Sequence, residues 1–199
     1  MNQRHIAIYT DFDGTVTGTE GSKAVFSPFY NSLLVPGSGS DYKSCRMKSP
    51  EEVASIFAQN DAYLKSINML MSDKAVAFFH TALASSDISV TIVTKNRADY
   101  IIAMLKHQGF SDAEISQLKI KDSGYKYNDV QIDLNSYETK AEHLYILDDS
   151  KADFSEMMRA AQDAGIKEHQ ISAYRCEVGS FAWDKYQEDI SDKLAHYKS

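Results

Sequence analysis

Two short apolar runs in the sequence each end in a pair of aspartates. Asp11 and Asp13 follow the run HIAIYT, and Asp148 and Asp149 follow the run LYIL. A carboxylate can act as a nucleophile, donate or accept a proton, or bind a hard cation such as Mg²⁺. Like charges packed together are unfavourable unless a cation joins them. If the fold brings the two pairs together, the sequence therefore predicts a cation site.

The elements around these aspartates alternate between strand and helix. Apolar, β-branched runs predict strands, and apolar residues spaced three or four apart predict helices. Expected strands cover residues 5–10, 88–94, 117–121, 144–147 and 170–174, and expected helices cover 71–86, 97–110, 153–165 and 181–197. This alternation predicts an α/β fold with a mostly parallel sheet and helices on both faces. Ligands bind beyond the carboxyl ends of such strands, where both aspartate pairs and Thr94 are expected to meet.

Residues 19–70 do not follow this alternation. They contain a Gly/Ser loop at 36–40 and the stretch SPEE at 49–52, which is typical of a helix start. We expect a small helical cap insertion over 19–70, after the first strand. Residues 1–18 and 71–199 are then expected to form the α/β core.

The stretch DFDGT, at 11–15, fits a magnesium site better than a calcium loop or a turn. Hard oxygen ligands favour Mg²⁺ over Zn²⁺, and Mg²⁺ is usually bound by one or two carboxylates together with a phosphate. A calcium loop needs a glycine where this chain has Val16, and an acid where it has Ser22. A simple Asp-Gly hairpin turn is an alternative, but it leaves Asp148 and Asp149 unexplained. The sequence thus predicts a metal and, with it, a phosphate ligand.

Three stretches carry a resemblance to a known family. IAIYTDFDGTVTG, VTIVTKN and YILDDSKAD resemble, in order, the signature stretches of the haloacid-dehalogenase (HAD) superfamily of phosphatases. The first stretch, an apolar strand followed by DxDGT, is the most specific. The resemblance implies a Rossmann-like three-layer sandwich with a cap inserted after the first or the second strand. The second acid, Asp13, favours a phosphatase or phosphotransferase, because ATPases and dehalogenases of the family usually lack it.

The resemblance also implies roles for the acidic residues. Asp11 is expected to attack phosphorus and form a phospho-aspartate, while Asp13 protonates the leaving oxygen and later deprotonates water. Mg²⁺ is expected to bind Asp11, the main-chain carbonyl of Asp13 and Asp148. Asp149 is expected as a further ligand or as an acceptor for a metal-bound water, a role for which Asp153 competes. The expected metal set is thus Asp11, Asp13, Asp148 and Asp149.

Two further residues are expected to bind the phosphate. Thr94 would donate a hydrogen bond to a phosphoryl oxygen from its hydroxyl or from its main-chain amide. The family also needs a lysine beside the nucleophile, and Lys140 is our choice because it fits a lysine at the start of a helix that precedes the acidic strand. If the preceding helix starts nearer residue 133, Lys140 lies too far from the strand ends, and Lys126 or Lys121 takes its place.

The short insertion favours an accessible site, and family members with open sites often accept phosphoproteins. We therefore expect a phosphatase of phosphoprotein side chains, phosphotyrosine included. Phe26, Phe29, Tyr30 and Tyr42 could flank an aromatic leaving group, although Phe26, Phe29 and Tyr30 are expected to form the core of the insertion. Two alternatives remain: a phosphatase of a small phosphorylated metabolite, and a non-catalytic module of HAD fold that binds or regulates a partner.

Bulk properties exclude several other classes of protein. The 199-residue chain has a net charge of −7 and 43% hydrophobic residues, which suits a globular domain and not a nucleic-acid-binding one. Its two cysteines, Cys45 and Cys176, have no spacing typical of zinc. No apolar run reaches the length of a signal peptide core or a membrane span. We expect a cytoplasmic protein, without excluding secretion that needs no cleavable signal.

Overall fold

The computed structural model of the protein describes residues 4–137, 140–177 and 183–198. These residues form a five-stranded parallel sheet with the strand order β3-β2-β1-β4-β5. The strands are β1 (Ile6–Thr10), β2 (Ile88–Val93), β3 (Lys119–Lys121), β4 (His143–Asp148) and β5 (Ile171–Arg175). All five were predicted, and the fold class is confirmed as a Rossmann-like α/β sandwich with a parallel sheet.

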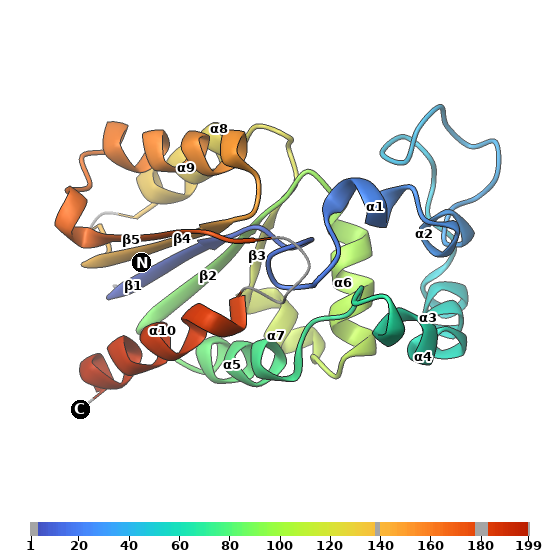
Figure 1. Cartoon of the computed structure of the whole chain (residues 1–199), viewed down its shortest axis with the longest axis horizontal. Coiled ribbons are helices and arrows are strands. Elements are labelled where there is room, and N and C mark those ends of the chain that lie inside the picture. Colours follow the sequence, from blue (N-terminus) through green and yellow to red (C-terminus); the bar gives the residue numbers. More distant parts are fainter. Residues whose placement is uncertain (1–3, 138–139, 178–182, 199) are drawn as a thin grey trace.

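Helices cover both faces of this sheet, so that the molecule has three layers (Figure 1). One face carries α8 (Lys126–Asn135) and α9 (Lys151–Asp163). The other face carries α5 (Asp73–Leu83) and α10 (Trp183–Lys198), with α6 (Ala98–His107) and α7 (Asp112–Gln117) beside them, and a 3₁₀ turn at Glu168–Gln170 precedes β5. No helix in the described part of the chain is long and apolar enough to cross a membrane.

The two central strands are covered on both sides. Every residue of β1 and β4 is buried, which explains why their sequences are nearly continuous apolar runs without polar alternation. Trp183 of α10 is fully buried between the rings of Phe78 and Phe79 of α5, with ring centroids 4.9 and 5.2 Å away. This aromatic contact joins the C-terminal helix to the face that α5 covers.

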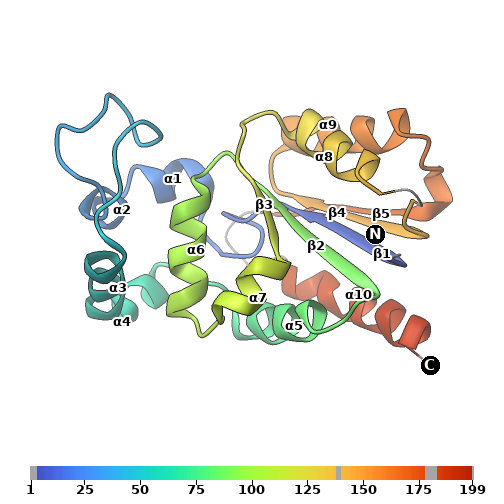
Figure 2. The same ribbon diagram turned by 180° about the vertical axis from the view of Figure 1, so that it is seen from behind.

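The insertion after β1 consists of α1 (Gly21–Val25), α2 (Pro28–Ser32), α3 (Pro50–Gln59) and α4 (Asp61–Ser66). These helices lie beyond α6, to one side of the sheet (Figure 2). The helix start predicted at SPEE is confirmed, because the Ser49 hydroxyl accepts a hydrogen bond from the Glu52 amide at 3.2 Å. An isolated bridge between Thr17 and Met71 brings the two ends of the insertion side by side.

The aromatic residues of the insertion do not form a core of their own. Phe29 packs edge-on against Phe57, with ring centroids 5.0 Å apart, and Tyr30 packs on Tyr100 of α6 at 4.7 Å. These rings belong to the same apolar cluster as one face of the sheet. The prediction was wrong for Phe26 at the end of α1, which is 77% exposed, lies edge-on to Tyr42 and is not part of that cluster.

Two helices of the α/β core, α7 and α8, were not among the ranges expected from an apolar helical period. The sequence of α8, KYNDVQIDLN, has few apolar residues to reveal a helical period. Several of its buried positions are instead occupied by the polar residues Lys126, Asp129 and Asp133. Lys126 and Asp133 form ion pairs with residues of other elements, which a local sequence pattern does not reveal, and Asp129 accepts a hydrogen bond from the Ser123 hydroxyl at 2.8 Å.

Candidate active site

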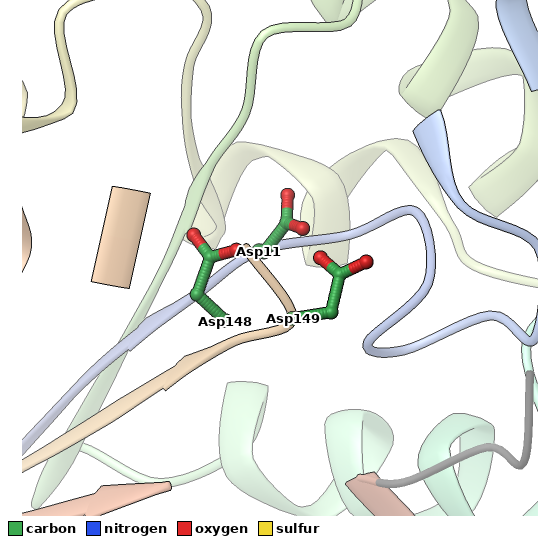
Figure 3. A group of neighbouring side chains, drawn as sticks. All are labelled: Asp11, Asp148 and Asp149. Atoms are coloured by element: carbon green, nitrogen blue, oxygen red, sulfur yellow. The ribbon is translucent and has the colours of Figure 1, made fainter. Parts of the chain in front are cut away.

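Three carboxylates meet where β1 and β4 end. The two strands are neighbours in register, with Thr10 opposite Leu147, and the Asp11 amide donates a hydrogen bond to the Leu147 carbonyl at 2.8 Å. Asp11, Asp148 and Asp149 each offer one oxygen to a group in which all three atoms lie within 4.8 Å of one another. Figure 3 shows these side chains projecting to the same side from the strand ends. The predicted meeting of Asp11 with Asp148 and Asp149 is thus present in the fold.

A buried lysine from α8 faces this group. The Lys126 ammonium lies 2.6 Å from Asp148 Oδ2, 3.2 Å from Asp11 Oδ1 and 3.6 Å from Asp153 Oδ2, and the lysine is 1% exposed. Burial by itself would lower the pKa of the lysine, but the Asp11 and Asp148 carboxylates raise it. Lys126 therefore remains a cation beside Asp11.

One lysine does not balance the negative charge at this edge. Burial raises the pKa of Asp11 to about 7, Lys126 opposes the shift, and a hydrogen bond and the charge of Asp149 add to it. Burial and the Asp11 charge likewise raise the pKa of Asp148 to about 7, and burial raises that of Asp149. A further cation between these oxygens would favour their ionised forms.

The donor set fits magnesium. All three side chains offer carboxylate oxygens, which are the hard ligands that Mg²⁺ prefers. The Ser150 amide donates to Asp148 Oδ1 at 2.9 Å and so fixes that carboxylate. Asp149 belongs to the group, whereas Asp153 pairs with Lys95 at 2.9 Å and with Lys126. Of the two acids that competed for the last ligand position, the geometry favours Asp149.

A glycine allows the chain to turn beside these oxygens. Gly14 has a φ of +77°, a conformation that other residues rarely adopt. A Cβ atom at this position would lie 2.4 Å from Asp149 Oδ2. Any side chain at residue 14 would therefore displace the Asp149 carboxylate.

Asp13 lies next to the three carboxylates but outside their group. It is 4% exposed, and its Oδ2 accepts a hydrogen bond from the side-chain amide of Asn96 at 2.8 Å. Burial raises the pKa of Asp13 to about 7, the Asn96 hydrogen bond opposes this, and the Asp11 charge adds to it. A carboxyl group with such a pKa can both release and accept a proton near neutral pH. Its side chain is thus suited to proton transfer, and only its main-chain carbonyl remains a predicted metal ligand.

Thr94 lies at the end of β2 and lines the same pocket as Asp11 and Asp13. Its amide donates to the Lys121 carbonyl at 2.9 Å within the sheet, so the predicted alternative of an amide donor to phosphate does not hold. Its hydroxyl oxygen accepts a hydrogen bond from the main-chain amide of Asn96 at 2.9 Å, which leaves the hydroxyl proton free to donate. The hydroxyl is therefore the group that could bind a phosphoryl oxygen.

The structure does not bring Lys140 to this site. Its ammonium donates to the Leu134 carbonyl and to Asn135 Oδ1, both at 3.0 Å, at the C-terminal end of α8. Our choice of Lys140 was wrong because α8 ends at Asn135, before this lysine, whose ammonium therefore caps a carbonyl of the last helical turn. Lys126, the predicted alternative, begins the same helix and reaches Asp11, while Lys121 does not line the pocket.

A pocket of about 420 Å³ covers the acidic group. Its floor includes Asp11, Asp13, Thr94 and Lys126, and its wall includes residues of the insertion. The insertion residues are Glu20, Gly21, Ser22, Val25, Phe26 and Tyr42. Because α1 and the loop with Tyr42 come from the insertion, this segment shapes the space above Asp11.

Asn96 is a residue of the site that the sequence analysis missed. It is 3% exposed and bridges Asp13 to the Tyr30 hydroxyl. Its partner Asp13 lies 83 positions away in the sequence, and an asparagine after a strand is common in ordinary loops. The only signal was its place in the stretch TKN, directly after a predicted strand end.

Comparison with solved structures identifies the fold of the chain. The HAD domain of the Legionella pneumophila effector Lem4 superposes with a TM-score of 0.74 at 21% identity, covering 96% of this chain and 95% of that one. That likeness shows that the chain has the fold of a HAD domain. No protein-family model and no curated protein matches the chain.

A nearer relationship is found with another effector of the same organism. The crystal structure of Legionella pneumophila effector Ceg4 with an N-terminal TEV protease cleavage sequence has 45% identity and a TM-score of 0.87, covering 96% of this chain and 95% of that one. A Ceg4 structure with an N-terminal yeast Hog1p sequence has 46% identity and a TM-score of 0.86, with 96% of both chains covered. The chain belongs to the same family as Ceg4.

Proposed function

We propose that the protein is a Mg²⁺-dependent phosphomonoester phosphatase that acts through a phospho-aspartate. One observation carries the proposal: a buried lysine lies 3.2 Å from Asp11, which lines a pocket and forms a set of three carboxylates with Asp148 and Asp149. A nucleophilic carboxylate must approach an anionic phosphate, and positive charge on both reduces their repulsion. Magnesium bound by the three carboxylates would supply that charge on one side, and Lys126 supplies it on the other.

The first step transfers the phosphoryl group to Asp11. An Asp11 oxygen forms a bond to phosphorus while the bond from phosphorus to the leaving oxygen breaks. The Lys126 ammonium holds a phosphoryl oxygen and keeps Asp11 ionised, and the Thr94 hydroxyl donates to another phosphoryl oxygen. Asp13 gives its proton to the leaving oxygen as the bond breaks.

The second step frees the phosphate. Asp13, now ionised, accepts a proton from a water molecule that attacks the phosphorus of the phospho-aspartate. The raised pKa of Asp13, about 7, suits this exchange of roles, because neither protonation state is strongly disfavoured near neutral pH. Asp11 is then regenerated as a carboxylate.

The pocket wall supports an aromatic phosphate ester as the substrate. Phe26 is 77% exposed and lies with Tyr42 at the pocket, their ring centroids 6.1 Å apart in an edge-on arrangement. The apolar faces of two rings above a phosphate site would accommodate a tyrosine side chain. We therefore propose phosphotyrosine in proteins as the substrate class, with small phosphorylated metabolites as the alternative.

Hydrolysis of p-nitrophenyl phosphate tests the activity. We expect turnover that needs Mg²⁺ and that falls by roughly 10⁴-fold or more in Asp11→Asn, because this variant lacks the nucleophile. The control is Asp163→Asn, since Asp163 is an exposed carboxylate on α9, and its turnover should match the unmodified protein. Absence of metal-dependent turnover on every phosphate ester would favour the non-catalytic module instead.

A panel of phosphotyrosine peptides, phosphoserine peptides and sugar phosphates tests the substrate class. We expect the highest kcat/KM on phosphotyrosine peptides and a loss of roughly 10-fold on them in Phe26→Ala. Tyr63→Ala is the matched control, because Tyr63 is a half-exposed aromatic residue of the insertion that does not line the pocket. Faster turnover of sugar phosphates than of phosphotyrosine peptides would contradict the proposal.

A further inference from the structure

Asn96 connects the proposed proton donor to the insertion. Its Nδ2 donates to Asp13 Oδ2 at 2.8 Å, and its Oδ1 accepts from the Tyr30 hydroxyl at 2.8 Å and from the Arg97 amide at 2.6 Å. Asn96, Asp13 and Tyr30 are each less than 5% exposed. The result is a buried chain of hydrogen bonds from α2 of the insertion to the carboxyl group at the end of β1.

The orientation of the Asn96 side-chain amide follows from the groups that donate to it. The main-chain amide of Arg97 can only donate, so it must face the oxygen of the Asn96 side chain and not its NH₂ group. The NH₂ group of Asn96 must then point at Asp13, where it can only donate. The Tyr30 hydroxyl adds a second donor to Oδ1 and so opposes rotation of the amide.

This arrangement makes the two oxygens of Asp13 unequal. Oδ2 accepts a hydrogen bond from Asn96 and is favoured as the oxygen without a proton. The proton of Asp13 is left to the other oxygen, Oδ1. A hydrogen bond from an amide that is itself held by two donors keeps the carboxyl group in one orientation.

We propose that Asn96 is a positioning residue for proton transfer, which holds Asp13 so that Oδ1 carries the proton to the leaving oxygen, and that Tyr30 holds Asn96 in turn. The inference rests on the proposed phosphatase function. In the first step the Oδ1–H bond breaks and the proton goes to the leaving oxygen, while Asp11 forms its bond to phosphorus. In the second step the same oxygen takes a proton from the attacking water.

Leaving groups that differ in their need for a proton test this role. Phenolate is a poor leaving group that needs protonation, whereas 2,4-dinitrophenolate leaves as a stable anion. The value of kcat/KM reports events up to the first phosphoryl transfer. The test compares kcat/KM on phenyl phosphate with kcat/KM on 2,4-dinitrophenyl phosphate, both with Mg²⁺, for the unmodified protein and for each variant.

In Asn96→Ala we expect kcat/KM to fall by roughly 10-fold to 100-fold on phenyl phosphate and by no more than about 3-fold on 2,4-dinitrophenyl phosphate. In Tyr30→Phe we expect a loss of about 3-fold to 5-fold on phenyl phosphate alone. Tyr100→Phe is the matched control, because Tyr100 is fully buried against Tyr30 and its hydroxyl has no hydrogen-bond partner among the described residues. It should change neither value.

Equal losses on both substrates in Asn96→Ala, or no loss on either, would overturn the proposal. If Asn96→Ala does not fold, Tyr30→Phe decides, since it removes one oxygen atom and no packing; an unchanged value on phenyl phosphate then overturns it. Asp13→Asn tests the proton donor separately from its positioning by Asn96. The loss in kcat/KM of this variant should be confined to phenyl phosphate and should exceed that of Asn96→Ala. A uniform loss in Asp13→Asn, or an inactive unmodified protein, removes the proposed function and this inference with it.

Discussion

Two groups of buried charges lie at opposite ends of the same sheet, and α8 contributes to both. Near the amino ends of the strands, Asp133 accepts hydrogen bonds from Arg4 at 3.0 Å and from the Tyr9 hydroxyl at 2.5 Å, and it also pairs with Lys119. At the carboxyl ends, Lys126 faces the cluster of carboxylates around Asp11. The first group has two cations for one carboxylate, and the second has one cation for several.

Burial acts in the same direction on the carboxyl pKa values of both groups, but the net shifts are opposite. Burial by itself would raise the pKa of Asp133, but Lys119, Tyr9 and Arg4 lower it below its ordinary value. Burial raises the pKa of Asp11 to about 7, and the single Lys126 does not reverse the shift. The Asp133 group is thus complete as it stands, whereas the Asp11 group retains negative charge that a bound cation can balance. Both groups contain buried carboxylates, so burial does not distinguish the candidate site. The distinguishing feature is negative charge that the neighbouring cations do not balance.

The largest effect that we expect is on stability, at the Asp133 end. Asp133→Asn leaves Arg4 and Lys119 without their carboxylate, and we expect the free energy of unfolding to fall by about 3–5 kcal/mol. Urea unfolding measures this change, and kcat of the folded fraction should stay within about 2-fold. Asp163→Asn, at an exposed site, should change stability by no more than about 0.5 kcal/mol. Equal stability of the two variants would contradict a structural role for Asp133.

At the carboxyl ends of the strands, loss of the Lys126 charge should affect catalysis. Lys126→Met keeps the length of the side chain and removes its charge, and we expect kcat/KM on p-nitrophenyl phosphate to fall by roughly 10²-fold to 10³-fold. The matched control is Lys140→Met, which loses only hydrogen bonds at the end of α8 and should stay within about 2-fold. Unimpaired turnover in Lys126→Met would remove the lysine from the proposed mechanism.

The pH dependence of stability should also distinguish the two ends. The pKa of Asp11, about 7, lies above its ordinary value of 3.8, so the folded protein binds more protons than the unfolded chain between these values. Stability of the metal-free protein should therefore decrease as pH rises through this window. The lowered pKa of Asp133 acts in the opposite sense, and its contribution is lost as pH falls towards acid.

Thermal unfolding with and without Mg²⁺ measures this difference. Because Mg²⁺ binds ionised carboxylates, we expect it to raise Tm by a few degrees at about pH 7.5 and by less at about pH 5.5. In Asp11→Asn the metal-free protein should lose less stability as pH rises, and the Mg²⁺ effect should shrink. A Mg²⁺ effect that is equal at both pH values, or larger at the lower one, would argue against a carboxylate metal site.

The smallest effect is expected at the rim of the pocket. The side chain of Lys95 is 54% exposed and pairs with Asp153 at 2.9 Å, so water screens its charge more than that of Lys126. We expect Lys95→Ala to raise KM for an anionic substrate by about 2-fold to 3-fold at low salt and by less at high salt, with kcat unchanged. Lys23→Ala, at an exposed lysine outside this pocket, should leave KM unchanged. A loss in kcat comparable to that of Lys126→Met would show that the two lysines have equivalent roles.

Much of the fold could be predicted because it depends on neighbours in the sequence. The five strands were found from short apolar runs, and their parallel direction followed from the alternation with helices. The meeting of Asp11 with Asp148 and Asp149 was predicted because parallel strands present their carboxyl ends at one edge. Helix α8 was missed because its buried positions hold Lys126, Asp129 and Asp133, which do not produce an apolar period.

The sequence by itself determined the acidic centre of the site, since Asp11 and Asp148 are placed by the strands that they end. Only the tertiary structure decided which lysine faces Asp11, which donor holds Asp13, and that Phe26 lies at the pocket instead of in a core. The physical reason is that strands are specified by residues a few positions apart. The contacts of Lys126 and Asn96 join elements that only the packing of α8 and the insertion against the sheet brings together, with Asn96 and Asp13 separated by 83 positions.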